Sequence, residues 1–404
     1  MDAQFSVPAV TYEEHQWVAE PDGMSGRARR ARASGSYQSC VPSRIKDYSP
    51  DLPSDVAADV EEAAAALAQL DTFVSSAMDQ ADVEAPMGAI LLRTESASSS
   101  QIEQLTVGAR QLGLAEISQS TSENAKTVMG NVRAMESALA IAGDIDESTV
   151  LAIHRRLLSS QTGWEQHAGR YRQQLVWVGR SRLGPVNASF VAPQPGLVPS
   201  AMADLVCFMN RLDLPVLLQI AVAHAQFETI HPFVDGNGRT GRALVHAMLR
   251  RSGLVTHIAV PLSAGLLVNT ERYFDALDSY RKGDTVPIVQ RFTDASRFAA
   301  SSGRTLIQDL RNQVDKDRVL LAGLRPQAIA WRVLPWLSAH PVLNARLLID
   351  ELGLSEISAQ RTLSQLTSAG ILVERTGLRR NRVWQHEAIL RILDEYAAGL
   401  RRSS

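Results

Sequence analysis

The stretch His231-Pro-Phe-Val-Asp-Gly-Asn-Gly-Arg-Thr-Gly-Arg242 places more chemically demanding residue types side by side than any other dozen residues of the chain. It contains one imidazole that can move a proton, one carboxylate that can hold a metal ion, three glycines and two arginines. Apolar helical patterns precede and follow it. A glycine-rich loop that enters a helix is a ready anion site, because unpaired N–H groups and the helix dipole favour negative charge. The stretch therefore predicts a nucleotide-phosphate site with a histidine base beside it.

Two common nucleotide loops do not fit this stretch. Gly236, Gly238 and Gly241 spell G-x-G-x-x-G, but a dinucleotide fingerprint needs a preceding strand and an acid about 20 residues later. Here a helical pattern precedes the loop, and residues 243–270 contain no Asp or Glu. A phosphate loop of the Walker type needs Gly-Lys-Ser/Thr, and the stretch has no lysine. A purely structural turn would not need His231, the carboxylate and both arginines together.

The helix expected before the loop starts near Pro215 and ends before Pro232, because the residue preceding a proline disfavours helical geometry. His224 lies seven residues before His231 and so on nearly the same face. For His224 a structural role, as a buried histidine held by a hydrogen bond, is the favoured interpretation.

The loop resembles the signature of the Fic domain, His-Pro-Phe-x-[Asp/Glu]-Gly-Asn-Gly-Arg-x-x-Arg, at every specified position. The resemblance extends over about residues 40–385. It implies a mainly α fold: a Fic-type helical bundle with a short β-hairpin flap, followed here by a C-terminal winged helix-turn-helix domain. Most Fic proteins transfer AMP from ATP to a hydroxyl of a target protein, so the resemblance implies ATP and Mg²⁺ as substrate and cofactor.

The resemblance also implies roles for the loop residues, and each role makes physical sense. His231 would be the general base for the attacking hydroxyl, and Asp235 would hold Mg²⁺ together with phosphate oxygens. The remaining roles are an anion cradle and two phosphate-pairing side chains. They fall on Gly236, Asn237 and Gly238 for the cradle, and on Arg239 and Arg242 for the outer phosphates.

Three further features take a meaning from the resemblance. The hairpin expected near 174–182 would be a flap that holds a target segment by strand addition. Asn269 and Tyr273 would meet the adenine, although spacing alone makes Tyr273 an ordinary core aromatic. Ser99-Ser-Gln-Ile-Glu103 resembles the Fic inhibitory helix, [Ser/Thr]-x-x-x-Glu-[Gly/Asn], in which Glu103 would pair with Arg242 and block the γ-phosphate. Position 104 departs from that pattern because it is Gln.

Composition alone gives the serine cluster near Glu103 a different interpretation, a polar and partly frayed helix with a surface glutamate. The wider chain has 404 residues, 45% hydrophobic and 21% charged, as in a soluble globular protein of two or three domains. Its net charge of −2 argues against a nucleic-acid coat over the whole protein.

The two cysteines cannot build a disulfide framework or a cysteine zinc site, which is typical of a reducing compartment. The N-terminal residues show no basic region followed by an apolar region, so no signal peptide is expected, and no apolar run is long enough to cross a bilayer. We therefore expect a cytoplasmic protein without membrane contact.

The expected domain organisation has four parts: an irregular N-terminal segment at 1–50, a helical region with the inhibitory helix at 51–120, the Fic catalytic core at 121–322, and a winged helix-turn-helix domain at 323–404. Within them, the expected helices are one from Ser54, the first half of 87–105, 121–142, 147–159, 198–212, one from Pro215, 242–251, 263–277 and 286–319.

The last 80 residues read as helix, tight turn, helix and β-hairpin: helices at 344–352 and 358–368, then strands at 371–374 and 381–384. From Arg325 onward there are 11 Arg against 7 Asp and Glu. The second helix carries one basic residue, Arg361, so the stronger electrostatic argument for DNA lies in the wing, with Arg375, Arg379, Arg380 and Arg382. A protein-docking winged helix is the alternative, and the basic run 26–32 reads as a solvated linker.

The leading hypothesis is thus an autoinhibited, Mg²⁺- and ATP-dependent protein adenylyltransferase that modifies a target protein or itself. One alternative is a DNA-binding regulator whose Fic domain senses a nucleotide. Another is removal of AMP from a modified protein by the same glutamate. A homodimer is one candidate assembly, and the sequence identifies neither the oligomeric state nor the target protein.

Overall fold

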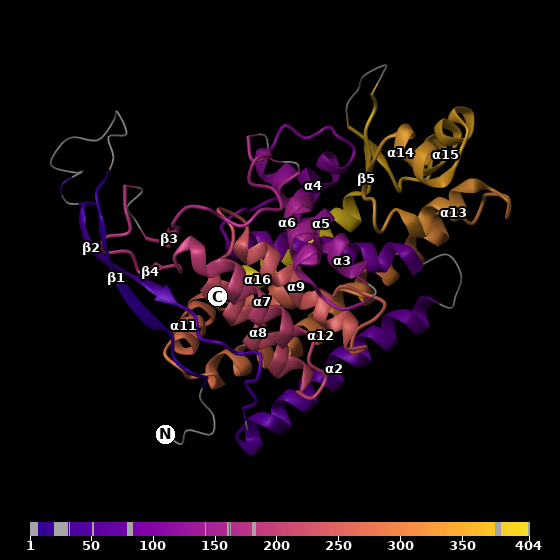
Figure 1. Cartoon of the computed structure of the whole chain (residues 1–404). Coiled ribbons are helices and arrows are strands. Elements are labelled where there is room, and N and C mark those ends of the chain that lie inside the picture. Colours follow the sequence, from indigo (N-terminus) through magenta and orange to yellow (C-terminus); the bar gives the residue numbers. More distant parts are fainter. Residues whose placement is uncertain are drawn as a thin grey trace. The chain divides into compact units, whose positions relative to one another are not determined.

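The computed structural model describes residues 7–19, 31, 33–50, 52–78, 84–141, 143–159, 161, 163–179, 183–375 and 381–402. The described chain is mainly helical with three small antiparallel sheets, which confirms the predicted helical fold class (Figure 1). None of its described helices is both long and apolar enough to cross a membrane.

The chain forms two compact units, each assembled from three segments. The first unit comprises Met1–Glu62, Ala140–Ser252 and Glu271–Thr293, and it contains the whole 231–242 loop. The second comprises Ala63–Leu139, Gly253–Thr270 and Asp294–Ser404, and it contains Glu103.

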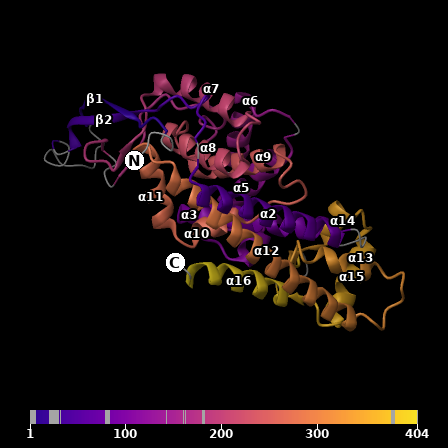
Figure 2. The same ribbon diagram turned by 90° about the horizontal axis from the view of Figure 1, so that it is seen from below.

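The first unit is built around one central helix. Every residue from Leu217 to Ile230 of α8 (Val216–Ile230) is buried, including polar side chains such as Gln219, which donates to Phe208 O at 2.8 Å. Helices α7 and α9 pack against α8, and α6 packs against α9 (Figure 2). The bounds of its neighbours in this unit are α6 Glu147–Leu158, α7 Val198–Met209, α9 Asn237–Arg251 and α11 Thr270–Arg281.

Helix α9 begins five residues earlier than the predicted 242–251 helix. Its N-terminal flank is Gly236, whose φ of 76° lies in the left-handed region. Gly241 lies inside the helix. Its lack of a side chain lets α9 pack closely on α8, because a Cβ there would come within 2.9 Å of the Phe227 ring. Gly241 therefore permits close helix packing. The glycines of this stretch suggested a loop, and for that reason the helix was predicted to start too late.

The prediction that residues 1–50 are irregular is wrong for the part of that segment that is described. Strands β1 (Thr11–Trp17) and β2 (Gly35–Val41) pair antiparallel in full register. Alternating side chains make the pairing stable: the Trp17 ring meets Tyr37 edge-on, and His15 stacks on Tyr37 at 5.5 Å. The basic run 26–32 lies almost entirely outside the described residues.

The second unit contains the inhibitory-helix candidate and the C-terminal module. Helix α3 packs against α5 and α10, and α4 packs against α5. The bounds are α3 Glu84–Ile102, α4 Ala109–Glu116, α5 Glu123–Leu139, α10 Leu262–Leu267, α13 Ile329–Trp336, α14 Ala345–Leu352, α15 Glu356–Ser368 and α16 Glu387–Arg402, with strands β5 Val342–Leu343, β6 Val373–Glu374 and β7 Trp384–Gln385.

Two long helices belong partly to each unit: α2 (Ser54–Met78) and α12 (Val286–Leu320). Both start where the sequence predicted. The predicted 263–277 helix is instead two helices, α10 and α11, with a break at Val268 and Asn269. A continuous apolar pattern concealed that break.

The composition-based interpretation of the serine cluster is also wrong. Helix α3 continues through it, and Ser96, Ser99 and Ser100 are buried. Asn131 on α5 donates to Ser96 O at 2.9 Å and to the Ser100 hydroxyl at 3.3 Å. Small hydroxyl side chains let α5 approach closely, and the Ser100 hydroxyl donates to Ser96 O of its own helix at 2.9 Å. The cluster is a packing surface, not a frayed end.

The end of α3 explains the unusual residue after Glu103. Gln104 has a φ of 64°, in the left-handed region that favours glycine. Its N–H bonds to Gln101 O, and the N–H of Leu105 bonds back to Ser100 O, which together form a Schellman motif. Glycine or asparagine fits that position with less strain, so this helix end is less stable with Gln104 than it would be with either of those residues.

Replacing Gln104 by glycine should therefore stabilise the second unit by about 1 kcal/mol, because the left-handed backbone loses its steric cost. Urea unfolding followed by circular dichroism measures the change. The Gln104→Ala variant is the matched control, since alanine keeps the Cβ and should leave the midpoint unchanged. Equal midpoints for all three proteins would contradict the strain at this position.

The C-terminal module has the predicted helix-turn-helix with a three-stranded sheet, order β5-β7-β6. Asn344 caps α14 and Gly353 ends it in the left-handed region, as the sequence indicated. Helix α16 after the wing was not predicted. In the wing, Arg375 pairs with Glu387 and Arg382 pairs with Glu374 at 3.1 Å. These acids offset part of the positive charge, and DNA binding stays a prediction.

Candidate active site

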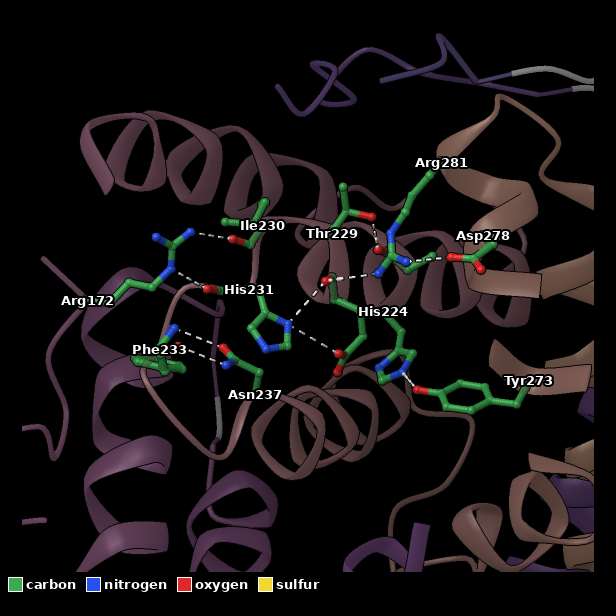
Figure 3. A network of polar contacts seen from close by, with 12 residues as sticks. Arg172, His224, Thr229, Ile230, His231, Phe233, Asn237, Tyr273, Asp278 and Arg281 are labelled. Atoms are coloured by element: carbon green, nitrogen blue, oxygen red, sulfur yellow. Dashed lines mark hydrogen bonds and ion pairs between the residues drawn. The ribbon is translucent and has the colours of Figure 1, made fainter. Parts of the chain in front are cut away.

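His231 stands at the point where the central helix ends. Its N–H still bonds to Phe227 O at 2.9 Å, but its φ of 50° and ψ of 60° are left-handed, so α8 stops there. A non-glycine residue in this region is strained, and such strain clusters at functional sites. Pro232 follows and cannot continue the helix. The geometry turns the imidazole out of the helix and towards the loop that enters α9 (Figure 3).

One carboxylate beside His231 was not identified from the sequence. His231 Nδ1 lies 3.4 Å from Glu228 O and 3.8 Å from the Glu228 carboxylate, while Glu228 itself is buried. A proton on Nδ1 would face these oxygens and leave the lone pair on Nε2. The i, i+3 spacing within one helix was the available signal for this contact.

The loop is closed by an asparagine side chain. Asn237 Oδ1 accepts from Phe233 N, and its Nδ2 donates to Phe233 O, both at 2.9 Å (Figure 3). The Asn237 side chain therefore fixes the loop, and its contribution to an anion cradle would come from its backbone N–H.

The buried His154 holds the loop in place from α6. His154 on α6 stacks on the Phe233 ring at 3.6 Å, and its Nε2 contacts Asp235 O at 3.1 Å. Its Nδ1 accepts from Gly169 N, so Nε2 carries the proton and donates. Burial lowers the pKa of His154 to about 4, against the opposing bond to Asp235 O. The ring is thus neutral and holds the Asp235 backbone in place.

The predicted anion cradle coincides with the start of α9. Thr240 N donates to Gly236 O at 3.0 Å, so the N–H groups of Asn237, Gly238 and Arg239 belong to the helix's first turn. Such groups point along the axis towards a ligand and carry the positive end of the helix dipole. Gly236 must be glycine, because it combines a left-handed φ with Leu157 at 2.7 Å from a Cβ position.

The metal-ligand candidate sits at the mouth of this cradle. The Asp235 side chain is 38% exposed, and its Oδ2 accepts from Arg239 at 2.9 Å. Among the described residues no group of three or more His, Cys, Asp or Glu could hold a metal ion. A single exposed carboxylate beside a phosphate site still fits Mg²⁺, which takes one or two carboxylates plus substrate phosphates. Arg242 is buried on α9, one turn further along.

A second residue not singled out from the sequence is Arg172, which connects the loop to the flap. It is 2% exposed, and its guanidinium donates to His231 O at 2.8 Å and to the carbonyls of Gln174 and Pro193. Burial lowers its pKa to about 10, so it remains a cation at neutral pH. One buried cation therefore joins the backbone of His231 to the carbonyls of Gln174 and Pro193; Figure 3 shows its bond to His231.

The predicted hairpin is present in part: strands β3 (Trp177–Val178) and β4 (Phe190–Val191) pair antiparallel, so the second strand lies beyond the predicted 174–182, and the role as a flap stays a prediction. Residues 180–182 lie outside the described residues. The N-terminal hairpin supports the pair: Trp17 meets Trp177 at 5.6 Å, and Cys40 packs with Phe190. The β1–β2 hairpin thus packs against the β3–β4 pair, which its composition did not suggest.

Tyr273 lies in the core as spacing alone indicated. It is 1% exposed, and its hydroxyl bonds to His224 Nε2 at 2.7 Å. Burial, and then the Arg242 charge, lowers the pKa of His224 to about 3, which confirms the structural role predicted for that histidine. Ser99, Glu103 and Asn269 belong to the second unit, so their roles at the loop stay predictions.

The neutral His154 makes acid sensitivity predictable. Its folded-state pKa is about 4 and its ordinary value 6.5, so the unfolded chain binds the proton first as the pH falls. The contribution of the neutral His154 ring to the free energy of unfolding is fully present above about pH 6.5. It is lost between there and pH 4, and the loss is on the order of 3 kcal/mol. Urea unfolding at several pH values measures it. His154→Gln should flatten the dependence, and an unchanged slope would contradict this origin.

Comparison with known proteins agrees with this geometry. Residues 144–249 match the model of the Fic/DOC family. Protein adenylyltransferase fic-1 of Caenorhabditis elegans is 33% identical over 151 residues, covering 36% of this chain and 26% of that protein. A probable protein adenylyltransferase of Aquifex aeolicus is 30% identical over 159 residues, covering 39% of this chain and 43% of that protein. The matches thus span less than half of these relatives.

A solved structure extends the likeness beyond the matched region. A Fic family protein from Desulfovibrio desulfuricans superposes with a TM-score of 0.53 at 21% identity, covering 84% of this chain and 98% of that one. Identity this low shows the fold alone. The chain therefore has the fold of a Fic protein, carries a Fic/DOC region at residues 144–249, and is a distant relative of protein adenylyltransferases.

Proposed function

We propose that this protein transfers AMP from ATP to a hydroxyl side chain, either of a target protein or of the protein itself. The observation that carries the proposal is the joint placement of a strained, partly exposed histidine at the end of α8 and a glycine-started helix directly after it. One supplies a proton acceptor and the other an anion site, five residues apart. The distant relatives that bear the name protein adenylyltransferase favour this chemistry over other nucleotide reactions.

The step is a substitution at the α-phosphorus of ATP. His231 Nε2 takes the proton of the target hydroxyl while that oxygen forms a bond to the α-phosphorus. The bond between the α-phosphorus and the bridging oxygen breaks, and diphosphate leaves. The Glu228 oxygens near Nδ1 keep the ring in the tautomer that accepts at Nε2 and stabilise the imidazolium that results.

The first turn of α9 and its arginines would hold the phosphates. Backbone N–H groups of Asn237, Gly238 and Arg239 face the α- and β-phosphates, and Arg242 pairs with the outer phosphate. Mg²⁺, held by Asp235, would neutralise charge on the departing diphosphate. These donors are fixed before the substrate arrives, because Asn237 and His154 already brace the loop.

We also propose that Glu103 limits this reaction by pairing with Arg242 in place of the γ-phosphate. The support is the placement of Glu103 at the end of α3, directly before a strained left-handed residue. A helix end of this kind opens at lower cost than a helix centre, which suits a switch. Asn269 and Tyr273 are retained as adenine-side candidates on the resemblance alone.

The test uses ATP labelled at the α- or at the γ-phosphate, with the purified protein alone or with cell lysate. Transfer of AMP gives protein-bound label from α-labelled ATP and none from γ-labelled ATP. Label from the γ position would identify a phosphotransferase instead. Net loss of AMP from a protein that was modified beforehand would identify removal of AMP as the activity instead.

Magnesium dependence should follow Asp235. Asp235→Asn is expected to raise the Mg²⁺ concentration for half-maximal transfer at least about tenfold, because a direct ligand matters no less than the outer-shell partners worth that much. Initial rates over a magnesium titration measure this. Asp213→Asn is the matched control, since Asp213 also pairs with an arginine, Arg211, at 2.6 Å. Equal dependence in both variants would remove Asp235 as the ligand.

A further inference from the structure

Helix α4, the first helix after Glu103, is held by the C-terminal module, which comprises α13 to α16 and the β5-β7-β6 sheet. A helix of eight residues is marginal on its own, and the residue before α4, Gly108, has no side chain to cap it. The Asp394 carboxylate of α16 takes that place, since it accepts from Ala109 N at 3.0 Å across 285 positions of sequence. The module therefore supplies the cap at the start of α4.

The middle of α4 lies directly on the sheet of the module. Gly113 is buried in α4, and a Cβ there would lie 2.8 Å from Val342 Cβ and 2.9 Å from Val342 Cγ2 on β5. Val342 is fully buried and β-branched, so its side chain has little freedom to give way. Ile117, directly after α4, belongs to the same hydrophobic cluster as Val342 and Leu390. Helix α4 is thus part of the core of the module.

The last residue of α4 also binds α3. Glu116 pairs with Arg93 of α3 and lies 2.9 Å from His340 Nδ1, in the segment after α13. The three side chains are 14–18% exposed, and Trp336 stacks on the His340 ring at 3.9 Å. Partly buried charge pairs are screened less than exposed ones. This contact therefore fixes α4 and the module to α3 at a point ten residues before Glu103.

A short link between the two helices contains Glu103. Helix α3 ends at Ile102 and α4 begins at Ala109, so residues 103–108 connect them. The N–H groups of Glu103 and Leu105 both donate to Ser100 O at 3.1 Å, which closes the link onto the end of α3. Helix ends open at lower cost than helix centres. A displacement of α4 therefore acts directly on these two hydrogen bonds.

We propose that the C-terminal module controls the end of α3, and so the position of Glu103, through α4. While Asp394 caps α4 and Val342 packs on it, the link stays closed on α3. When the module displaces α4, the bonds to Ser100 O open, and residue 103 leaves its place. That a displaced Glu103 raises AMP transfer rests on the proposed function, whereas the coupling of the module to the end of α3 does not.

Amide hydrogen exchange of Leu105 in the full chain measures this coupling. Gly113→Ala places a methyl group against Val342 and should speed the exchange about 5- to 150-fold, the range of a typical coupling between two sites. Gly399→Ala is the matched control, because it is the same change inside α16 and a Cβ there meets no atom within 4 Å. It should leave the exchange of Leu105 within about twofold of the parent protein.

A second variant tests the coupling from the module's side without adding volume. Asp394→Ala removes the cap of α4 and should speed the exchange of Leu105 about 2- to 30-fold. Glu395→Ala, at the next exposed acid of α16, should leave it unchanged. Exchange near the parent rate in both Gly113→Ala and Asp394→Ala, or equal acceleration in the two controls, would overturn the proposal.

The rate of label transfer from α-labelled ATP, measured on the same variants, separates the coupling from the proposed function. Faster exchange of Leu105 together with faster transfer is the expected result. Faster exchange with an unchanged transfer rate would support the coupling and remove the inhibitory role of Glu103. The exchange measurement involves no nucleotide, so it decides the coupling even in a protein that transfers no AMP.

Discussion

Replacing His231 by alanine is expected to lower the rate of AMP transfer about 10²- to 10⁴-fold, the usual contribution of a positioned general base. Alanine at this position cannot accept a proton, while Arg172 continues to bond to the carbonyl of residue 231. The loop geometry should therefore survive. The measurement is the initial rate of label transfer from α-labelled ATP at saturating nucleotide.

Nucleotide affinity separates a lost base from a lost site. The phosphate groups in the proposal belong to α9 and not to His231, so His231→Ala should bind ATP within about twofold of the parent protein, much less than one hydrogen bond is worth. A matched control is His257→Ala, a half-exposed histidine of the second unit that bonds to Asp71. A transfer rate that stays near the parent value in His231→Ala would remove the general-base assignment.

Replacing Glu103 by glycine should raise the transfer rate about 5- to 150-fold, the range of a typical coupling free energy between two competing contacts. The change removes the carboxylate that, in the proposal, competes with the γ-phosphate for Arg242, and glycine is well tolerated at a helix end. The increase should appear both in modification of the protein itself and in label on lysate proteins. Glu103→Gln, which keeps the size and removes the charge, should give an intermediate rate.

The double variant Glu103→Gly with His231→Ala is the control for specificity, because release of an inhibitor cannot rescue a missing base. Its rate should equal that of His231→Ala alone. Glu351→Gly, at an exposed glutamate of α14, tests whether any glutamate-to-glycine change acts the same way. If Glu103→Gly transfers no more label than the parent protein, the inhibitory role of Glu103 is wrong.

The candidate loop was predictable because its residues are consecutive. The stretch His231–Arg242 contains the histidine, the carboxylate and the glycine-started helix, and the structure places them where α8 ends and α9 begins. The long helices were predictable for a similar reason, since their starts carry ordinary signals. Asp146, for example, caps α6 by accepting from Thr149 N at 2.7 Å.

Residues that act across long sequence separations could not be predicted in this way. Arg172 supports His231 from 59 positions away, and in the sequence it looks like the first residue of an ordinary strand. The N-terminal hairpin depends on contacts such as Trp17 Nε1 with Leu183 O, 166 positions apart. The burial of the serines could not be predicted from composition for another reason. A serine whose hydroxyl bonds to its own helix, as Ser100 does, can pack in the protein interior.

The left-handed backbone of His231 has a consequence for how this protein can change over time. At such a position asparagine or glycine has less backbone strain, by about 1 kcal/mol. A substitution to either residue can therefore raise the free energy of unfolding while it removes the proposed base. Stability screens on this protein would thus enrich inactive sequences at residue 231. A copy with asparagine or glycine at residue 231 would resist unfolding slightly better than its parent, and under the proposed function selection for activity would keep the strained histidine in place.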